Sequence, residues 1–252
     1  MKKIIKRIFH DLGYRIERIN VPTDPDSRVA ATLPASECYA KFVSSGPIFQ
    51  PWLGHGDFVA AYEGVKEKTL VSPDRCYLLW KLAQHARQLR GDFIECGVYR
   101  GGTALLLART LPSEGKTLWL FDSFEGLPKE SAAQGDFYKQ GTFNETSLKE
   151  VSQLLLPYAK RLEVRKGWIP STFAGLDHLQ FSFAHVDVDL HDPALACCEF
   201  IYPRLVPGGV MVFDDYGYPA CRGEREAVDK FFAGKPEPVI SLPSGQALVL
   251  KM

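Results

Sequence analysis

The spacing of hydrophobic and polar positions changes near residue 70. Residues 1–19 place apolar residues at helical spacing with lysine and arginine between them, which predicts a basic amphipathic helix. Residues 20–60 are rich in proline and small residues, as is typical of loops. From about residue 72 the pattern becomes regular. We therefore expect an N-terminal helical and loop extension over residues 1–70 and one larger domain over residues 71–252.

In the larger domain, short apolar runs alternate with helical patterns. The runs predict strands at 92–98, 117–122, 161–167, 181–189, 208–216, 238–242 and 247–252. Helices are predicted at 76–89, 103–111, 148–159, 194–205 and 224–232, the first of them introduced by Ser72, Pro73 and Asp74. This alternation predicts an α/β fold with a mostly parallel seven-stranded sheet. Only residues 243–246 separate the last two strands, so we expect an antiparallel hairpin at one edge.

Composition narrows the class of protein. The 252 residues are 46% hydrophobic and 24% charged, as in globular proteins, and 30 basic residues balance 30 acidic ones. No global charge therefore favours nucleic acid. No apolar run approaches the roughly 20 residues of a membrane span, and the charged N-terminus does not resemble a secretory signal. The six scattered cysteines predict neither a metal knuckle nor a disulfide framework, so we expect a cytoplasmic enzyme.

The first candidate for chemistry is the turn after the first predicted strand, which reads E-C-G-V-Y-R-G-G over residues 95–102. Its glycine spacing is neither that of a dinucleotide-binding turn nor that of a phosphate-binding loop. Glu95 offers a carboxylate for a cationic amino group, and Asp122, at the end of the next strand, suits two ribose hydroxyls. Together they favour S-adenosylmethionine over a dinucleotide, although a generic strand-to-helix turn with a buried Glu95 stays an alternative.

The second candidate is a set of four aspartates, Asp187, Asp189, Asp214 and Asp215, at the ends of the fourth and fifth predicted strands. If those strands are neighbours, the carboxylates crowd together and raise one another's pKa unless a cation is present. Hard oxygen ligands of this kind suit Mg²⁺ better than zinc. The alternative is that each is a helix cap or a loop residue.

Several segments together resemble the macrocin-type sugar O-methyltransferases, the family of the mycinamicin and novobiocin tailoring enzymes. The likeness extends over about residues 69–250. It is carried by GDFIECGVYRGGTALLLA, LFDSFEGLP, RKGW, HVDVDLHDP, YPRLVPGGVMVFDDY and REAVDKFF. The resemblance implies a Rossmann-like fold, S-adenosylmethionine and Mg²⁺ as cofactors, and methylation of a hydroxyl of a sugar on a natural product or a glycan. The family commonly has Gly and Tyr where this chain has Val188 and His191.

The resemblance also implies roles for individual residues. The metal ligands fall on Asp187, Asp214 and Asp215, and the general base falls on Asp189, beside Asp187 at the reacting centre. His185 and His191 are rival bases. The expected cofactor-binding residues are Thr69, Leu70, Glu95, Gly97, Arg100, Gly101, Gly102, Asp122, Ser123 and Trp168. Trp168 follows Gly167 and is a candidate to stack on adenine, with a core or lid role as the alternative.

The N-terminal extension suggests how the chain could meet its acceptor and its partners. The extension is expected to line the acceptor pocket, and the resemblance implies a homodimer or homotetramer in which it reaches a neighbouring active site. Residues 1–19 could instead lie on an anionic membrane surface, although packing against protein is the favoured interpretation. A glycosyltransferase that uses Asp187-Val188-Asp189 to hold a metal and a nucleotide sugar is the alternative function. An NAD-dependent reductase is disfavoured because its glycine fingerprint is absent.

Overall fold

The computed structural model describes residues 50–54, 56–128 and 137–252, so the helix expected at 1–19 lies outside the described residues. Contacts divide the chain into two compact units, residues 1–39 and 40–252, and all of the described residues belong to the second. Within it, the segment 57–68 packs against helices of the larger domain. The functional division at residue 70 stays a prediction.

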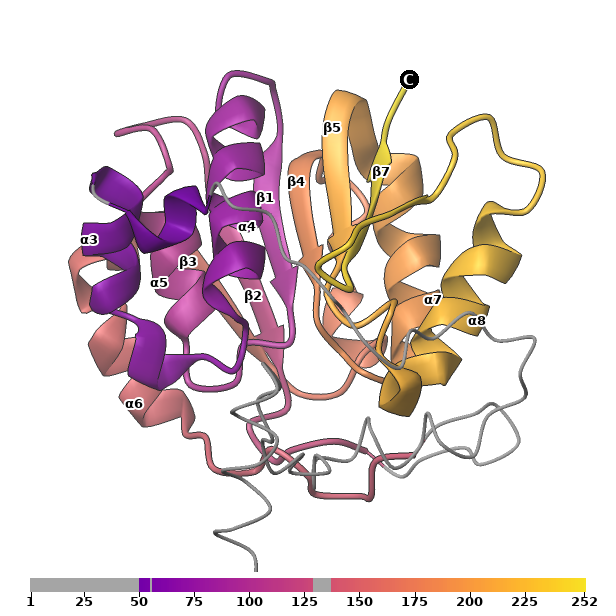
Figure 1. Cartoon of the computed structure of the whole chain (residues 1–252), viewed down its shortest axis with the longest axis horizontal. Coiled ribbons are helices and arrows are strands. Elements are labelled where there is room, and N and C mark those ends of the chain that lie inside the picture. Colours follow the sequence, from indigo (N-terminus) through magenta and orange to yellow (C-terminus); the bar gives the residue numbers. More distant parts are fainter. Residues whose placement is uncertain (1–49, 55, 129–136) are drawn as a thin grey trace, which may run out of the picture. The chain divides into compact units, whose positions relative to one another are not determined.

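A seven-stranded sheet forms the centre of this unit (Figure 1). Its strands are β1 (Asp92–Cys96), β2 (Leu118–Asp122), β3 (Leu162–Lys166), β4 (Phe181–Val186), β5 (Leu205–Phe213), β6 (Ile240–Ser241) and β7 (Ala247–Leu250). Their order is β3-β2-β1-β4-β5-β7-β6. The first five are parallel, whereas β7 pairs antiparallel with both β5 and β6. The predicted parallel sheet with a C-terminal antiparallel hairpin is confirmed.

The helices largely follow the prediction. They are α3 (Asp57–Glu63), α4 (Pro73–Ala86), α5 (Gly102–Ala108), α6 (Leu148–Leu154), α7 (His191–Ile201) and α8 (Arg222–Phe232). Loop was wrongly predicted at residues 57–60, where α3 begins and buries Phe58 and Ala61. After α6, Pro157 lies in a 3₁₀ segment, Leu156–Arg161, because proline lacks the donor that a continuing α-helix needs.

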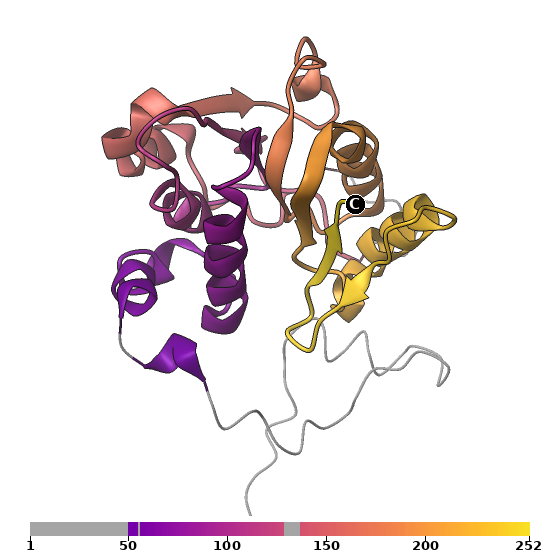
Figure 2. The ribbon, with the colours of Figure 1, turned by 90° about the horizontal axis from the view of Figure 1, so that it is seen from above.

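Helices cover both faces of the sheet (Figures 1 and 2). Side chains of α3, α4 and α5 form one hydrophobic cluster with strand residues such as Phe93, and those of α7 and α8 form a second with the next residue, Ile94. Successive strand residues point to opposite faces, so a sheet buried on both sides has continuous apolar strands. This arrangement explains why the strands of this chain show little hydrophobic alternation.

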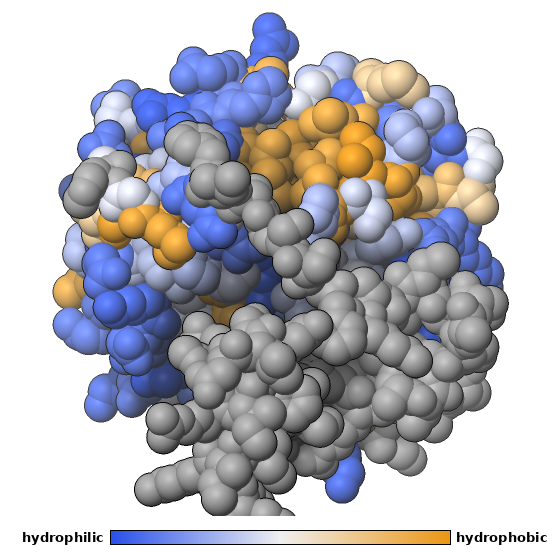
Figure 3. Space-filling view, in the orientation of Figure 1, coloured by the Kyte–Doolittle hydropathy of each residue, from blue (hydrophilic) through white to orange (hydrophobic). Residues whose placement is uncertain are grey.

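Part of the surface is apolar. Figure 3 shows apolar side chains gathered beside α4, over β4, β5 and β7. Leu250 on β7 is 44% exposed, and its neighbour Leu248 lies in the same cluster as α4. In the described part of the chain, no helix combines the length and the apolar character that crossing a bilayer requires.

Candidate functional site

The predicted polar residues lie at the carboxyl edge of the parallel strands. β1 and β4 are neighbours at the centre of the sheet. The chain leaves β1 for α5 on one face and leaves β4 for α7 on the other. Ligands of open α/β sheets bind where the connections diverge in this way. The turn 97–101 and the segment 187–190 both lie at this position.

The glycine turn is built for close backbone approach. Gly97 has φ 89°, and a Cβ atom added there would lie 2.8 Å from the carbonyl carbon of Asp187. Gly101, with φ 83°, precedes α5 as its N-cap. At Gly102 an added Cβ would lie 2.7 Å from the carbonyl of Lys68 and 2.8 Å from the Cβ of Thr69. The turn therefore packs against Asp187, which follows β4, on one side and against Lys68 and Thr69, which precede α4, on the other.

Asp122 fixes this turn to the end of β2. Its Oδ2 accepts hydrogen bonds from the backbone N–H groups of Val98 (2.7 Å) and Tyr99 (2.8 Å), and its Oδ1 accepts one from Phe124 (2.6 Å). A carboxylate has about four acceptor positions, so three backbone donors leave capacity for a hydroxyl. The structure thus gives Asp122 a positioning role that the sequence did not predict, and its binding of ribose stays a prediction.

The other predicted cofactor residues surround these two elements. Trp168 follows Gly167, whose N–H donates to the Asp122 carbonyl (2.9 Å), and its side chain is 41% exposed. Ser123 is buried and donates to the Gly126 carbonyl. Leu70 is exposed, whereas Arg100 is partly buried. An exposed indole beside Asp122 is compatible with stacking on an adenine ring.

Glu95 lies within the sheet, and its predicted cofactor role stays a prediction. It is fully buried on β1, and its Oε1 lies 2.9 Å from Nδ1 of His185, its register partner on β4. The other ring nitrogen of His185 lies 3.4 Å from Asp214 Oδ1. His185 is itself fully buried between these two carboxylates, which is the arrangement of a structural histidine and not of a base that meets a substrate.

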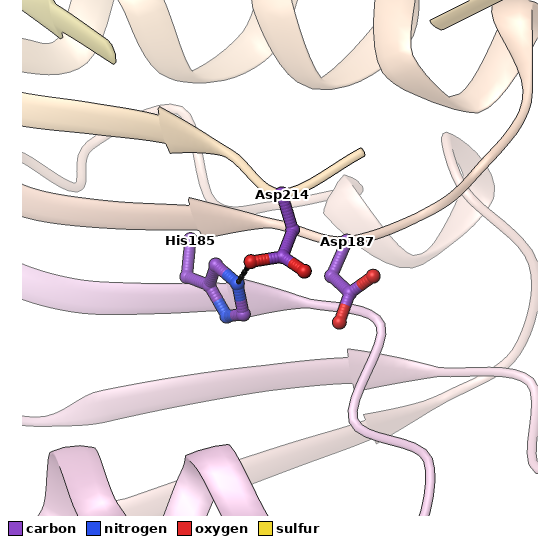
Figure 4. Close-up of side chains that lie close together, drawn as sticks. All are labelled: His185, Asp187 and Asp214. Carbon is purple, nitrogen blue, oxygen red and sulfur yellow. Dashed lines mark hydrogen bonds and ion pairs between the residues drawn. The ribbon is translucent and has the colours of Figure 1, made fainter. Parts of the chain in front are cut away.

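The acidic side chains converge as the strand order predicts. Asp187 follows β4 and Asp214 follows β5, its parallel neighbour (Figure 4). Ligand atoms of His185, Asp187 and Asp214 all lie within 4.8 Å of one another, and the carboxyl groups of Asp187 and Asp215 share a hydrogen bond. The carboxylates among them are hard oxygen donors, which suit Mg²⁺.

The closeness of these buried carboxyl groups shifts their pKa values. Burial, with the charges of Asp214 and Asp215, raises the pKa of Asp187 well above its usual range. Burial and the Asp214 charge raise the pKa of Asp215 to about 6. Burial would raise the pKa of Asp214 as well, but the hydrogen bond from His185 and the charge of Arg75 lower it. Like charges at close range oppose ionisation unless a cation neutralises them. A divalent ion bound between Asp187 and Asp215 would therefore favour the ionised form of both carboxyl groups.

Two partners of Asp214 were not predicted. Nη1 of Arg75, on α4, donates to Asp214 Oδ2 and lies 3.5 Å from Asp215 Oδ1. Nε2 of Gln246, from the β6–β7 turn, donates to Asp214 Oδ1 (2.6 Å). One signal was available for Arg75, since it occupies the buried face of its helix together with Leu79 and Ala83. Nothing in the sequence pattern pointed to Gln246.

Asp189 and His191 remain the two candidate bases at this edge. Asp189 is buried in the left-handed region (φ 60°), and the Cys221 thiol donates to its Oδ1 (3.5 Å). One ligand atom each of Asp189, Asp215 and Cys221 lie within 4.8 Å of one another. His191 begins α7, and its Nδ1 lies 2.9 Å from Asp192 Oδ1. The assignment of Asp189 as base stays a prediction.

The His185 environment predicts a pH dependence of stability. Burial lowers the pKa of His185, but its hydrogen bonds to Asp214 and Glu95 outweigh this and raise it to about 9. The stabilisation is therefore complete below the ordinary value of about 6.5 and is lost as the pH rises through 9. We expect the melting temperature to fall between pH 7 and 10 more steeply than in His185→Gln. The exposed His178→Gln should behave as wild type, and equal slopes for all three proteins would contradict the assignment.

A family model for macrocin O-methyltransferase (TylF) matches residues 69–240 of the chain. The match includes the glycine turn, Asp122, Trp168 and all four aspartates of the site.

Individual relatives are more distant. A tetracenomycin rhamnosyl 4'-O-methyltransferase of Streptomyces olivaceus is 30% identical over 144 residues, which are 52% of this chain and 55% of that protein. Mycinamicin III 3''-O-methyltransferase of Micromonospora griseorubida is 29% identical over 155 residues, 56% of this chain and 60% of that protein. The alignments thus span between 55% and 60% of these curated relatives. The solved structure of the O-methyltransferase NovP matches with a TM-score of 0.65 at 22% identity, covering 73% of this chain and 82% of that one.

Proposed function

Because the chain belongs to the macrocin O-methyltransferase family, we propose that it transfers a methyl group from S-adenosylmethionine to a sugar hydroxyl. The acceptor is a glycosylated natural product or a glycan, and the reaction depends on Mg²⁺. The relatives support the acceptor class, since their names specify O-methylation of glycosylated tetracenomycin and of mycinamicin III. The observation that carries the proposal is that Asp187, beside the glycine turn, has a ligand atom within 4.8 Å of one of Asp214 and shares a hydrogen bond with Asp215.

The methyl donor would lie along the turn after β1. Gly97 and Gly101, both with positive φ, give this turn its shape, and the start of α5 presents N–H groups. Asp122 would accept the ribose hydroxyls, and Trp168 would cover the adenine. The segment that contains Thr69 and Leu70 packs on Gly102 and would lie over the methionine end.

The residues at the acidic edge fit a magnesium ion. Asp187, Asp214 and Asp215 would hold it, and once bound it would stabilise the developing alkoxide of the acceptor and fix the position of that oxygen. A sugar hydroxyl is almost fully protonated at neutral pH, so a base is useful as well. Asp189 would accept the proton, with help typically worth about 10²–10⁴-fold. Alignment of the oxygen, methyl carbon and sulfur contributes more, since effective molarities reach about 10⁵–10⁸ M.

A direct assay tests the proposal. The protein is incubated with S-adenosylmethionine and a panel of glycosides, and release of S-adenosylhomocysteine is measured with Mg²⁺, with chelator, and after Mg²⁺ is restored. We expect glycoside-dependent release that chelator removes and Mg²⁺ restores. Calorimetry with S-adenosylmethionine, a UDP-sugar and NAD separately should show binding of the first alone. Binding of the UDP-sugar alone would favour the glycosyltransferase alternative and overturn the proposal.

We also propose a homodimer or homotetramer in the cytoplasm, with residues 1–70 completing the acceptor pocket. The exposed apolar surface over β5 and β7 supports association, because large exposed apolar patches mark interfaces. Light scattering coupled to gel filtration tests the oligomeric state, and a monomer at micromolar concentration would contradict it. Co-sedimentation with anionic vesicles tests the alternative role of residues 1–19.

A further inference from the structure

A buried arginine occupies the acidic cluster from the α4 side. Arg75 is 7% exposed. Its Nη1 donates to Oδ2 of Asp214 and to the Asp214 carbonyl, and it lies 3.5 Å from Oδ1 of Asp215. Its single positive charge therefore lies between two of the carboxylates that would hold a divalent ion.

Several neighbours hold this guanidinium in place. Its Nε donates to the hydroxyl of Ser72 (3.2 Å), and its Nη2 donates to the carbonyl of Leu70 (3.4 Å). The ring of Tyr218 lies 4.9 Å from the guanidinium carbon. Contacts on this many sides make it a fixed part of the site, unlike a surface arginine that samples many rotamers.

Asp214 keeps one acceptor position, on Oδ2, and that oxygen already binds Arg75. Gln246 and His185 both face Oδ1, at 2.6 Å and 3.4 Å, which engages both of its acceptor positions. Oδ2 accepts from Arg75. A divalent ion must therefore either displace Arg75 from Oδ2 or bind beside a like charge.

From this geometry we propose that Arg75 is the internal counter-cation of the Asp214–Asp215 pair and competes with the divalent ion for it. This inference rests on the proposed metal site. Arg75 is thus a positioning residue that keeps the carboxylates in place without metal and lowers the affinity for the ion. Its contact with Leu70 also joins the acidic cluster to the segment expected to cover the cofactor.

Binding of Mn²⁺, followed by electron paramagnetic resonance of the free ion, tests the competition. Removing a positive charge this close to a divalent ion should strengthen binding, and we expect Arg75→Gln to lower the Kd for Mn²⁺ about tenfold or more. Arg75→Lys keeps the positive charge, so its Kd for Mn²⁺ should stay above that of Arg75→Gln. Lys81→Gln removes a charge from an exposed position of the same helix and should leave the Kd unchanged. Thermal melting verifies that each variant is folded.

An unchanged or weaker affinity in Arg75→Gln overturns the inference. Asp187→Asn tests the metal site independently of Arg75. If Asp187→Asn loses Mn²⁺ binding, the metal site is supported, and the Arg75→Gln result then tests the competition alone. If Asp187→Asn binds Mn²⁺ as wild type does, the metal site itself fails. Should Arg75→Gln not fold, nuclear magnetic resonance of the Arg75 Nε–H in the wild type decides. Saturating Mg²⁺ should speed its hydrogen exchange at least about tenfold, and an unchanged rate overturns the competition.

Discussion

Alanine in place of Gly97 is expected to lower the free energy of unfolding by about 2–5 kcal/mol and to abolish binding of S-adenosylmethionine. Gly97 has φ 89°, which costs an alanine about 1–2 kcal/mol. The added methyl group would also collide with the carbonyl of Asp187, and overpacking costs about 1–3 kcal/mol more. Relief of that collision must move Asp187, whose N–H pairs with the Cys96 carbonyl (2.8 Å), so the metal ligand moves with it.

Gly115 provides a matched control for this prediction. Its φ is 81°, nearly that of Gly97, but an alanine Cβ there would meet nothing within 4 Å. Gly115→Ala should therefore cost only the backbone term of about 1–2 kcal/mol and leave cofactor binding intact. Urea denaturation and titration calorimetry measure both effects. Equal stabilities of the two variants would show that the approach of Gly97 to Asp187 is unimportant.

Asparagine in place of Asp189 is expected to lower kcat about 10²–10⁴-fold, with the Kd for S-adenosylmethionine nearly unchanged. The substitution removes the proton-accepting charge but keeps the size of the side chain. Asparagine also tolerates the left-handed backbone of this position (φ 60°) better than almost any other residue, so the fold should be preserved. A loss of turnover can then be assigned to lost proton acceptance.

The measurement is release of S-adenosylhomocysteine in steady state, with cofactor affinity followed by calorimetry. Asp177→Asn, at an exposed position paired with Arg204, should show wild-type kcat. If Asp189→Asn retains a third or more of the wild-type kcat, Asp189 is not the base. His191→Gln would then be the next variant to measure, because His191 is the other candidate at this edge.

The sequence was sufficient to predict the parallel sheet and the convergence of Asp187 with Asp214 and Asp215. Consecutive βαβ units constrain strand order and handedness strongly, so residues that end successive strands must meet at one edge. The same logic placed the glycine turn after β1 beside the end of β2. Both predictions follow from chain connectivity, which can be derived from the order of strands and helices along the sequence.

Side-chain direction was much harder to predict. Glu95 was expected to offer its carboxylate to the cofactor, and the sequence did not predict that one of its oxygens pairs with His185. Strand β1 is apolar toward both faces, so its pattern does not tell which way each residue points. Arg75 and Gln246 reach Asp214 from α4 and from the last hairpin; the place of Arg75 on the buried face of its helix showed that it is buried but not which residue it contacts.

The partners of Asp214 come from positions as distant as 75 and 246 in the chain. Arg75 and Asp214 are 139 positions apart, against 90 for Glu95 and His185 across β1 and β4, so closing the Arg75 contact is the more costly in entropy and should come late in folding. Until Arg75 reaches Asp214, the carboxylates of the site would stay hydrated and repel one another. Added Mn²⁺ should consequently slow unfolding of the native protein while leaving the early refolding phases unchanged.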